Sequence, residues 1–127
     1  MPEGKGHEPF SKSLGYAWRG FWNALYQERN LRIHLVIAIL ALLACAALRV
    51  AFWGWVVVIC LIGLVVVAEL INTAIESAVD LASPQEHPLA GRAKDIAAAA
   101  VLFSALTAVV AGLAIYLHSF LRLIGVL

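Results

Sequence analysis

The stretch of sequence that decides the fold is residues 51–68, AFWGWVVVICLIGLVVVA, which contains no charged residue. As a helix this stretch is about 27 Å long, nearly the thickness of the hydrocarbon core of a bilayer. The whole chain agrees with it, since 63% of its 127 residues are hydrophobic and only 13% are charged. A soluble domain of this size needs far more polar surface. We therefore predict an all-α integral membrane protein.

Further apolar segments lie on both sides of this run. Residues 31–50 predict a first membrane span, residues 51–80 a second span with a polar end, and residues 96–118 a third. Ser83 and Pro84 break the helical pattern after the second span. A short polar loop is therefore expected between the second and third spans.

The part of the chain before these spans has a different pattern. Residues 1–9 contain two prolines and two glycines and are predicted to be disordered. Over residues 10–30, apolar side chains recur at three- and four-residue steps, with Trp, Lys and Arg among them. This pattern predicts an amphipathic helix that lies in the headgroup region of the membrane. Together with the three spans it forms one predicted domain, residues 10–127.

Basic residues are concentrated on one side of the predicted spans. The positive-inside rule then places the N-terminal segment and the loop at 80–95 in the cytoplasm, and the turn at 49–52 outside. The net charge of +1 gives no reason to expect a nucleic-acid partner. The basic residues are Lys5, Lys12, Arg19, Arg29, Arg32, Arg92 and Lys94 on the inner side, and Arg49 and Arg122 on the outer side.

A row of polar side chains follows the second apolar run. At about 100° per residue, Glu69, Asn72, Glu76 and Asp80 fall within about 80° of one another on a helical wheel. Charged side chains at a membrane span are costly, and a merely solvated helix end would scatter them around the wheel. We therefore interpret this face as a functional site at the cytoplasmic end of the span.

Aligned carboxylates repel one another unless cations neutralise them. Mg²⁺ commonly binds one or two carboxylates together with the phosphates of a substrate. Phosphoryl transfer uses such an ion together with a positive group near the phosphates. Lys94 follows in the predicted loop and can supply that positive charge, and Asp95 can add a ligand or hold Lys94.

A further carboxylate lies on the predicted surface helix. Glu28 falls on the same stripe of the helical wheel as Phe21, where a solvated acidic residue is not expected. A position facing the carboxylate end of the second span explains this placement, and the alternative is that the helix ends before residue 28. Arg32, four residues later, is the neighbour expected for Glu28.

With these residues in view, the chain resembles the prokaryotic diacylglycerol kinase family of three-span membrane enzymes. The segments ELINTAIE (69–76), VD (79–80) and HPLAGRAKDIAAAAV (87–101) resemble the family signature. The resemblance covers almost the whole chain. It implies a lipid kinase that uses MgATP, forms homotrimers with active sites shared between subunits, and resides in the bacterial inner membrane.

The resemblance also implies a role for each residue of the site. Glu69 is expected to be the catalytic base, and Glu28 and Glu76 to hold Mg²⁺ and the ATP phosphates. The remaining nucleotide-binding and supporting positions are Asn72, Lys94, Asp95 and Asp80. Neither a Walker motif nor the HRD and DFG motifs of protein kinases occurs in the chain.

The motifs that bear on the lipid substrate resemble two different branches of that family. Residues 28–34, ERNLRIH, and the pair at 83–84 resemble the undecaprenol kinase branch, whereas Gly91 and Arg92 resemble the diacylglycerol branch. On balance these motifs favour undecaprenol, with diacylglycerol as the alternative.

Two more residues are weaker candidates for the site. Trp18 is a candidate for lining a substrate cleft, although the aromatic belt at a membrane surface also accounts for it. His87 is a candidate contact to nucleotide, although a solvated histidine in a turn is the simpler interpretation. A different class of function, a small transporter that uses Glu69 to couple ions or protons, leaves the rest of the polar row without a purpose.

Overall fold

The computed structural model describes residues 8–127, which form four helices and no strand. They are α1 (Phe10–Gln27), α2 (Arg29–Ala47), α3 (Phe52–Ala82) and α4 (Pro88–Leu123). The prediction of an all-α chain is confirmed for these residues. The predicted disordered segment 1–9 lies outside the described residues except for Glu8 and Pro9, which precede α1.

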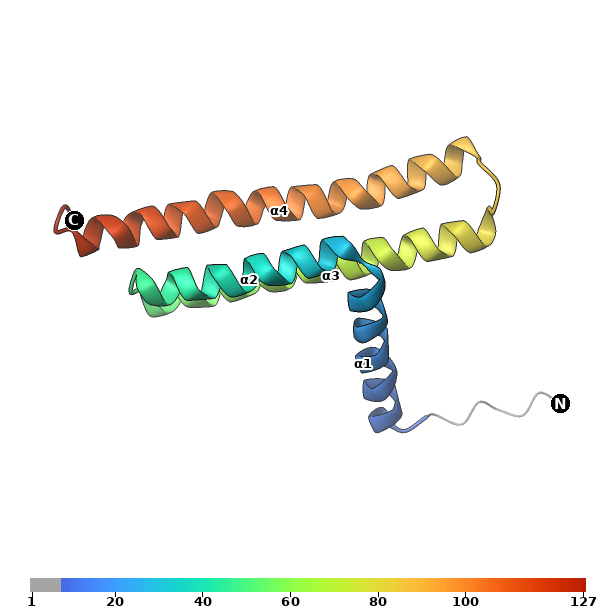
Figure 1. Cartoon of the computed structure of the whole chain (residues 1–127), viewed down its shortest axis with the longest axis horizontal. Coiled ribbons are helices and arrows are strands. Elements are labelled where there is room, and N and C mark those ends of the chain that lie inside the picture. Colours follow the sequence, from blue (N-terminus) through green and yellow to red (C-terminus); the bar gives the residue numbers. More distant parts are fainter. Residues whose placement is uncertain (1–7) are drawn as a thin grey trace.

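Three of the helices are long and apolar enough to cross a membrane. The most apolar windows of α2, α3 and α4 have mean hydropathies of 2.1, 2.7 and 2.3. These three helices run side by side, whereas α1 runs crosswise to them near the start of α2 (Figure 1). The prediction of three spans preceded by one further helix is therefore confirmed. The position of α1 on the membrane surface stays a prediction.

The three long helices differ in length, and this difference exposes the polar row. The 19 residues of α2 span about 28 Å, whereas the 31 residues of α3 and the 36 of α4 span about 46 and 54 Å. A short turn joins α2 to α3, so the extra length of α3 extends beyond the start of α2. The polar ends of α3 and α4 therefore stand outside the part needed to cross the hydrocarbon core, which is about 30 Å thick.

The third span begins earlier than predicted. The sequence predicts a polar loop up to Asp95 and a span from residue 96, but α4 already begins at Pro88. Proline is favoured at the first position of a helix, and Nδ1 of His87 accepts a hydrogen bond from the backbone N–H of Leu89 at 3.1 Å. Pro88 and His87 therefore start the helix, and only residues 83–87 form the connection.

The first helix ends earlier than predicted, at Gln27 rather than near residue 30. Glu28 has an extended backbone conformation, with φ −99° and ψ 111°, and α2 begins directly after it. Nη1 of Arg32 donates to the backbone oxygens of Leu25 and Tyr26, at 3.0 and 2.7 Å. A cation on the last carbonyl groups stabilises a helix end, so Arg32 fixes the sharp bend between α1 and α2.

The best-packed part of the molecule lies near the turn between α2 and α3. Cys45, Val50 and Val58 are buried there, against side chains from all three spans. Gly54 lies in the first turn of α3, where an added Cβ would collide with Val50. Arg49 in the turn adopts the left-handed region with φ 50°, which closes the connection tightly. Close packing at this end therefore fixes the α2–α3 hairpin, and the polar row lies toward the other end of α3.

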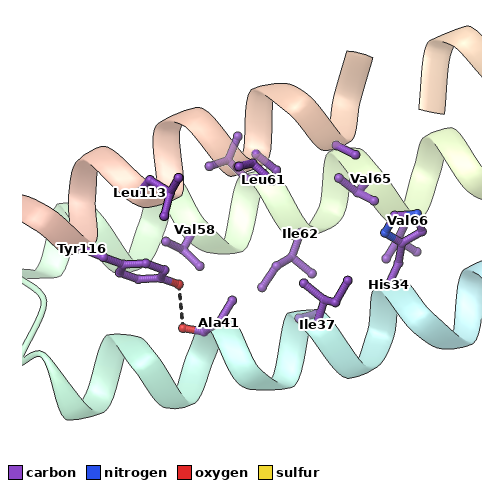
Figure 2. Close-up of a pocket in the computed structure, with 15 residues that line it drawn as sticks. His34, Ile37, Ala41, Val58, Leu61, Ile62, Val65, Val66, Leu113 and Tyr116 are labelled. Carbon is purple, nitrogen blue, oxygen red and sulfur yellow. Dashed lines mark hydrogen bonds between the residues drawn. The ribbon is translucent and has the colours of Figure 1, made fainter. Parts of the chain in front are cut away.

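Tyr116 joins α4 to α2 across this core, where its hydroxyl group also accepts a weak hydrogen bond from Sγ of Cys45 at 4.0 Å. The hydroxyl group of Tyr116 donates to the backbone oxygen of Ala41 at 2.8 Å (Figure 2). We expect Tyr116→Phe to lower the free energy of unfolding by about 0.6 kcal/mol and by no more than about 1.7 kcal/mol, as for other hydrogen bonds between membrane helices. Unfolding in mixed micelles of increasing denaturing-detergent content measures this change.

The matched control for that variant is Tyr26→Phe on α1. Tyr26 is 77% exposed, and its hydroxyl group makes no hydrogen bond within residues 8–127. Its substitution should leave the stability unchanged. Equal effects of the two variants would show that the bond to Ala41 does not hold α2 and α4 together.

Candidate active site

The polar row on α3 begins with a buried carboxylate. Glu69 is 3% exposed and is the only buried charged side chain in the part of the chain that the structure describes. Its Oε1 lies 3.1 Å from Nε2 of His34, which projects from α2. A buried carboxylate without a partner would be strongly destabilising, so the imidazole accounts for its position.

The next members of the row contact each other one turn further along α3. Nδ2 of Asn72 donates a hydrogen bond of 3.0 Å to Oε1 of Glu76. Oδ1 of Asn72 is buried and has no hydrogen-bond partner among the described residues. An unsatisfied buried acceptor is uncommon and costly, which indicates that a donor or a cation belongs at this atom.

The last member of the row reaches across to α4. Nζ of Lys94 donates to Oδ1 of Asp80, and the two residues form an ion pair between the polar ends of α3 and α4. This hydrogen bond is the main cause that raises the pKa of Lys94 above its ordinary value, and the negative charges of Asp80 and Glu76 add to it. Lys94 therefore carries its positive charge at neutral pH beside the row.

The sequence suggested a different environment for Lys94. It placed Lys94 and Asp95 in a loop, with Asp95 as a possible partner of the ammonium group. Both residues lie on α4, and consecutive residues on a helix point about 100° apart. The side chain of Lys94 is directed to Asp80 on α3, whereas that of Asp95 is exposed.

Glu28 lies at the bend between α1 and α2 rather than on the surface helix. The wheel argument that placed it on the stripe of Phe21 is therefore wrong, because the helix ends before it. The expected pairing of Glu28 with Arg32 is also not formed, since Arg32 caps the end of α1 instead. Glu28 remains half-buried where α1 meets α2 and α3.

The two weaker candidates lie at the edge of this region. Trp18 is 63% exposed on α1, and its ring contacts those of Phe21 and Trp22. His87 starts α4 through its hydrogen bond with Leu89. His87 thus has a structural role, and no hydrogen bond or ring pair joins Trp18 to the row within residues 8–127.

Comparison of the sequence with known proteins shows which family the chain belongs to. The model of the family described as "Prokaryotic diacylglycerol kinase" matches residues 15–116 of the chain. This range includes all of α2 and α3, and therefore every residue of the polar row. The chain belongs to the prokaryotic diacylglycerol kinase family. As a member of this family it is a lipid kinase, which confirms the resemblance and supports phosphoryl transfer over the transporter alternative.

The chain is similar to relatives from both branches of the family, some named undecaprenol kinase and some diacylglycerol kinase. The undecaprenol kinase of Bacillus subtilis is 40% identical over 108 residues, which cover 85% of this chain and 88% of that protein. The diacylglycerol kinase of Synechocystis is 42% identical over 101 residues, 79% of this chain and 58% of that protein. The diacylglycerol kinase of Escherichia coli is 37% identical over 99 residues, 78% of this chain and 81% of that protein. Overall identity therefore does not separate the two lipids.

Sequence analysis did not include His34 among the site residues of this kinase. A histidine near the first turns of a membrane helix is usually explained as an interface residue. Equal spacing from the turn would not have found it, because His34 lies 13 residues before the end of α2 and Glu69 lies 17 residues after the start of α3. The contact therefore depends on how α2 and α3 pack against each other, which the sequence pattern does not show.

Proposed function

We propose that this kinase transfers the γ-phosphoryl group of MgATP to the hydroxyl group of a membrane lipid alcohol, with undecaprenol favoured over diacylglycerol. The observation that carries the proposal is the order of the row on α3. The buried carboxylate of Glu69 lies nearest the apolar part of the bundle, and the ion pair of Asp80 and Lys94 lies at its polar end. This order suits a hydroxyl group that comes from the membrane and a charged nucleotide that comes from water.

In this mechanism Glu69 acts as the general base. The oxygen of the lipid alcohol forms a bond to the γ-phosphorus while its proton passes to the carboxylate of Glu69. The bond from that phosphorus to the bridging oxygen breaks, and ADP leaves with the electron pair. The ammonium group of Lys94, which Asp80 holds at the polar end of the row, would stabilise negative charge on the transferred group.

The residues present fit a magnesium ion, although the described residues contain no group of three or more His, Cys, Asp or Glu side chains arranged to hold a metal. The carboxylate of Glu76 and the unsatisfied Oδ1 of Asn72 provide oxygen ligands, which Mg²⁺ prefers. Glu28 and Glu76 would hold the ion together with the ATP phosphates. When bound, Mg²⁺ supplies positive charge that offsets the charge of the phosphates.

The functional unit in this proposal is a homotrimer with shared active sites. Within residues 8–127 of one chain, three or more His, Cys, Asp or Glu side chains do not gather at one place. A neighbouring copy would bring a second carboxylate to Glu76, as the family resemblance implies. Asp95 and Asn72 would contact the nucleotide, as the family resemblance implies. The basic residues near the polar row favour a cytoplasmic position for this end and for the N-terminus. The family resemblance implies that the membrane is the inner membrane of a bacterium.

A transfer assay tests the proposal directly. Purified protein in detergent micelles receives labelled ATP and either undecaprenol or diacylglycerol at equal surface concentration, with Mg²⁺ or with a chelator. We expect label in the lipid fraction, faster with undecaprenol, and none when the chelator is present. Absence of transfer to both lipids would refute the proposed function, and faster transfer to diacylglycerol would refute only the choice of lipid.

A further inference from the structure

An apolar groove leads to the contact between His34 and Glu69. It has a volume of about 270 Å³ and is lined by side chains of α2, α3 and α4. Figure 2 shows His34 at one end of this groove and Tyr116 at the other, with Val58, Ile62 and Val65 between them. His34 is therefore the polar residue at the end of the groove nearest the row on α3.

The contact itself has a defined direction. A carboxylate has no proton to donate, so Nε2 of His34 donates and Oε1 of Glu69 accepts. No other hydrogen bond or ion pair of Glu69 is formed within residues 8–127. The imidazole thus holds one carboxylate oxygen, and Oε2 is left for another donor.

Because Glu69 is buried, its orientation depends on the hydrogen bond from His34. The side chain of Glu69 is 4% exposed, and water therefore cannot replace the imidazole as a donor at little cost. The ring of His34 is itself partly buried between the groove and α3. Without the ring, rotation about the side-chain bonds of Glu69 would no longer be restricted by a hydrogen bond.

We propose that His34 is a positioning residue, whose Nε2–H holds Oε1 of Glu69 so that Oε2 faces a lipid hydroxyl group at the end of the groove. This inference rests on the proposed function of Glu69 as the base. The proton of the hydroxyl group still passes to Glu69, and His34 keeps its own proton throughout. Because general-base catalysis depends on a short and well-aligned approach, loss of the contact should slow the chemical step rather than weaken binding.

Three variants in the full-length protein test this role. His34→Ala removes the donor, His34→Gln replaces it with a carboxamide N–H, and His118→Ala is a matched control at the exposed far end of α4. We expect His34→Ala to lower kcat by up to about 100-fold, the loss that a misplaced catalytic group can cause. The KM values for lipid and ATP should stay unchanged, His34→Gln should recover most of kcat, and His118→Ala should behave as wild type.

Other outcomes would overturn the assignment. Full kcat in His34→Ala shows that Glu69 needs no such support. A raised KM for lipid with unchanged kcat shows that His34 binds substrate instead. His34→Gln that is as slow as His34→Ala shows that the imidazole itself takes part in proton transfer.

A spectroscopic measurement separates this inference from the proposed function and does not require an active protein. The ¹⁵N chemical shifts of the His34 ring report which nitrogen carries a proton. We expect a protonated Nε2 in the wild-type protein and a changed ring signal in Glu69→Leu, whereas the signal of His118 should not change. An unchanged His34 signal refutes the contact, whereas a changed signal in a protein that transfers no phosphate refutes the proposed function alone.

Discussion

Replacing Glu69 by Gln is expected to lower kcat for phosphate transfer by about 10²- to 10⁴-fold, the usual contribution of a general base. The carboxamide has nearly the same size and can still accept the hydrogen bond from His34. It cannot accept a proton from the lipid hydroxyl group, so the chemical step is lost while the fold is kept. Initial rates with labelled ATP in detergent micelles measure the effect.

The matched control for that change is Glu86→Gln. Glu86 is an exposed carboxylate in the connection between α3 and α4, and the same substitution removes the same charge there. Its rate should equal that of the wild type. Near-normal turnover of Glu69→Gln would show that another group, or no group, takes the proton, and the assignment of Glu69 as the base would be wrong.

Lys94→Met is expected to lower kcat by about 10²- to 10³-fold, the loss seen when one preorganised charge or donor is removed from a transition state. The substitution keeps an unbranched side chain but removes the ammonium group that Asp80 holds beside the row. Negative charge on the transferred phosphoryl group would then lack the positive partner that we propose for it. The KM for ATP should also rise, because the same charge attracts the phosphates before the reaction.

Arg122→Gln is the control for Lys94, since Arg122 lies in the last turn of the same helix at the opposite end of the molecule. It removes an equal charge far from the row and should leave kcat and KM unaltered. If both variants lose activity to the same degree, net charge rather than the position of Lys94 is responsible. If neither loses activity, Lys94 has no role in the transfer.

Much of the fold was predictable because it depends on local pattern. The apolar run at 51–68 is long enough for a span, and the three- and four-residue steps between Phe10 and Leu25 predict the helix before it. Several boundaries were wrong, most of all the start of α4. Sequence analysis treated the stretch before residue 96 as a loop because of its charges, whereas Pro88 and its cap at His87 start α4 there.

The site was predictable only where one helix carries it. Glu69, Asn72 and Glu76 share a face of α3 because helical geometry fixes their relative directions, and the contact of Asn72 with Glu76 agrees with that face. Glu28 could not be placed in this way, since the helix on which its direction was calculated ends one residue earlier. Arg32, expected beside Glu28, is directed to the carbonyl groups of Leu25 and Tyr26.

The sequence by itself determined that this chain has three helices long and apolar enough to cross a membrane. It also determined that one of them carries an acidic row at its polar end, and which family of lipid kinases the chain belongs to. Only the tertiary structure decided which side chains complete that row: His34 beside Glu69, and Lys94 beside Asp80 rather than with Asp95. The physical reason is that periodicity fixes directions within one helix. Which residues of two helices meet depends on where each helix starts and how the helices pack.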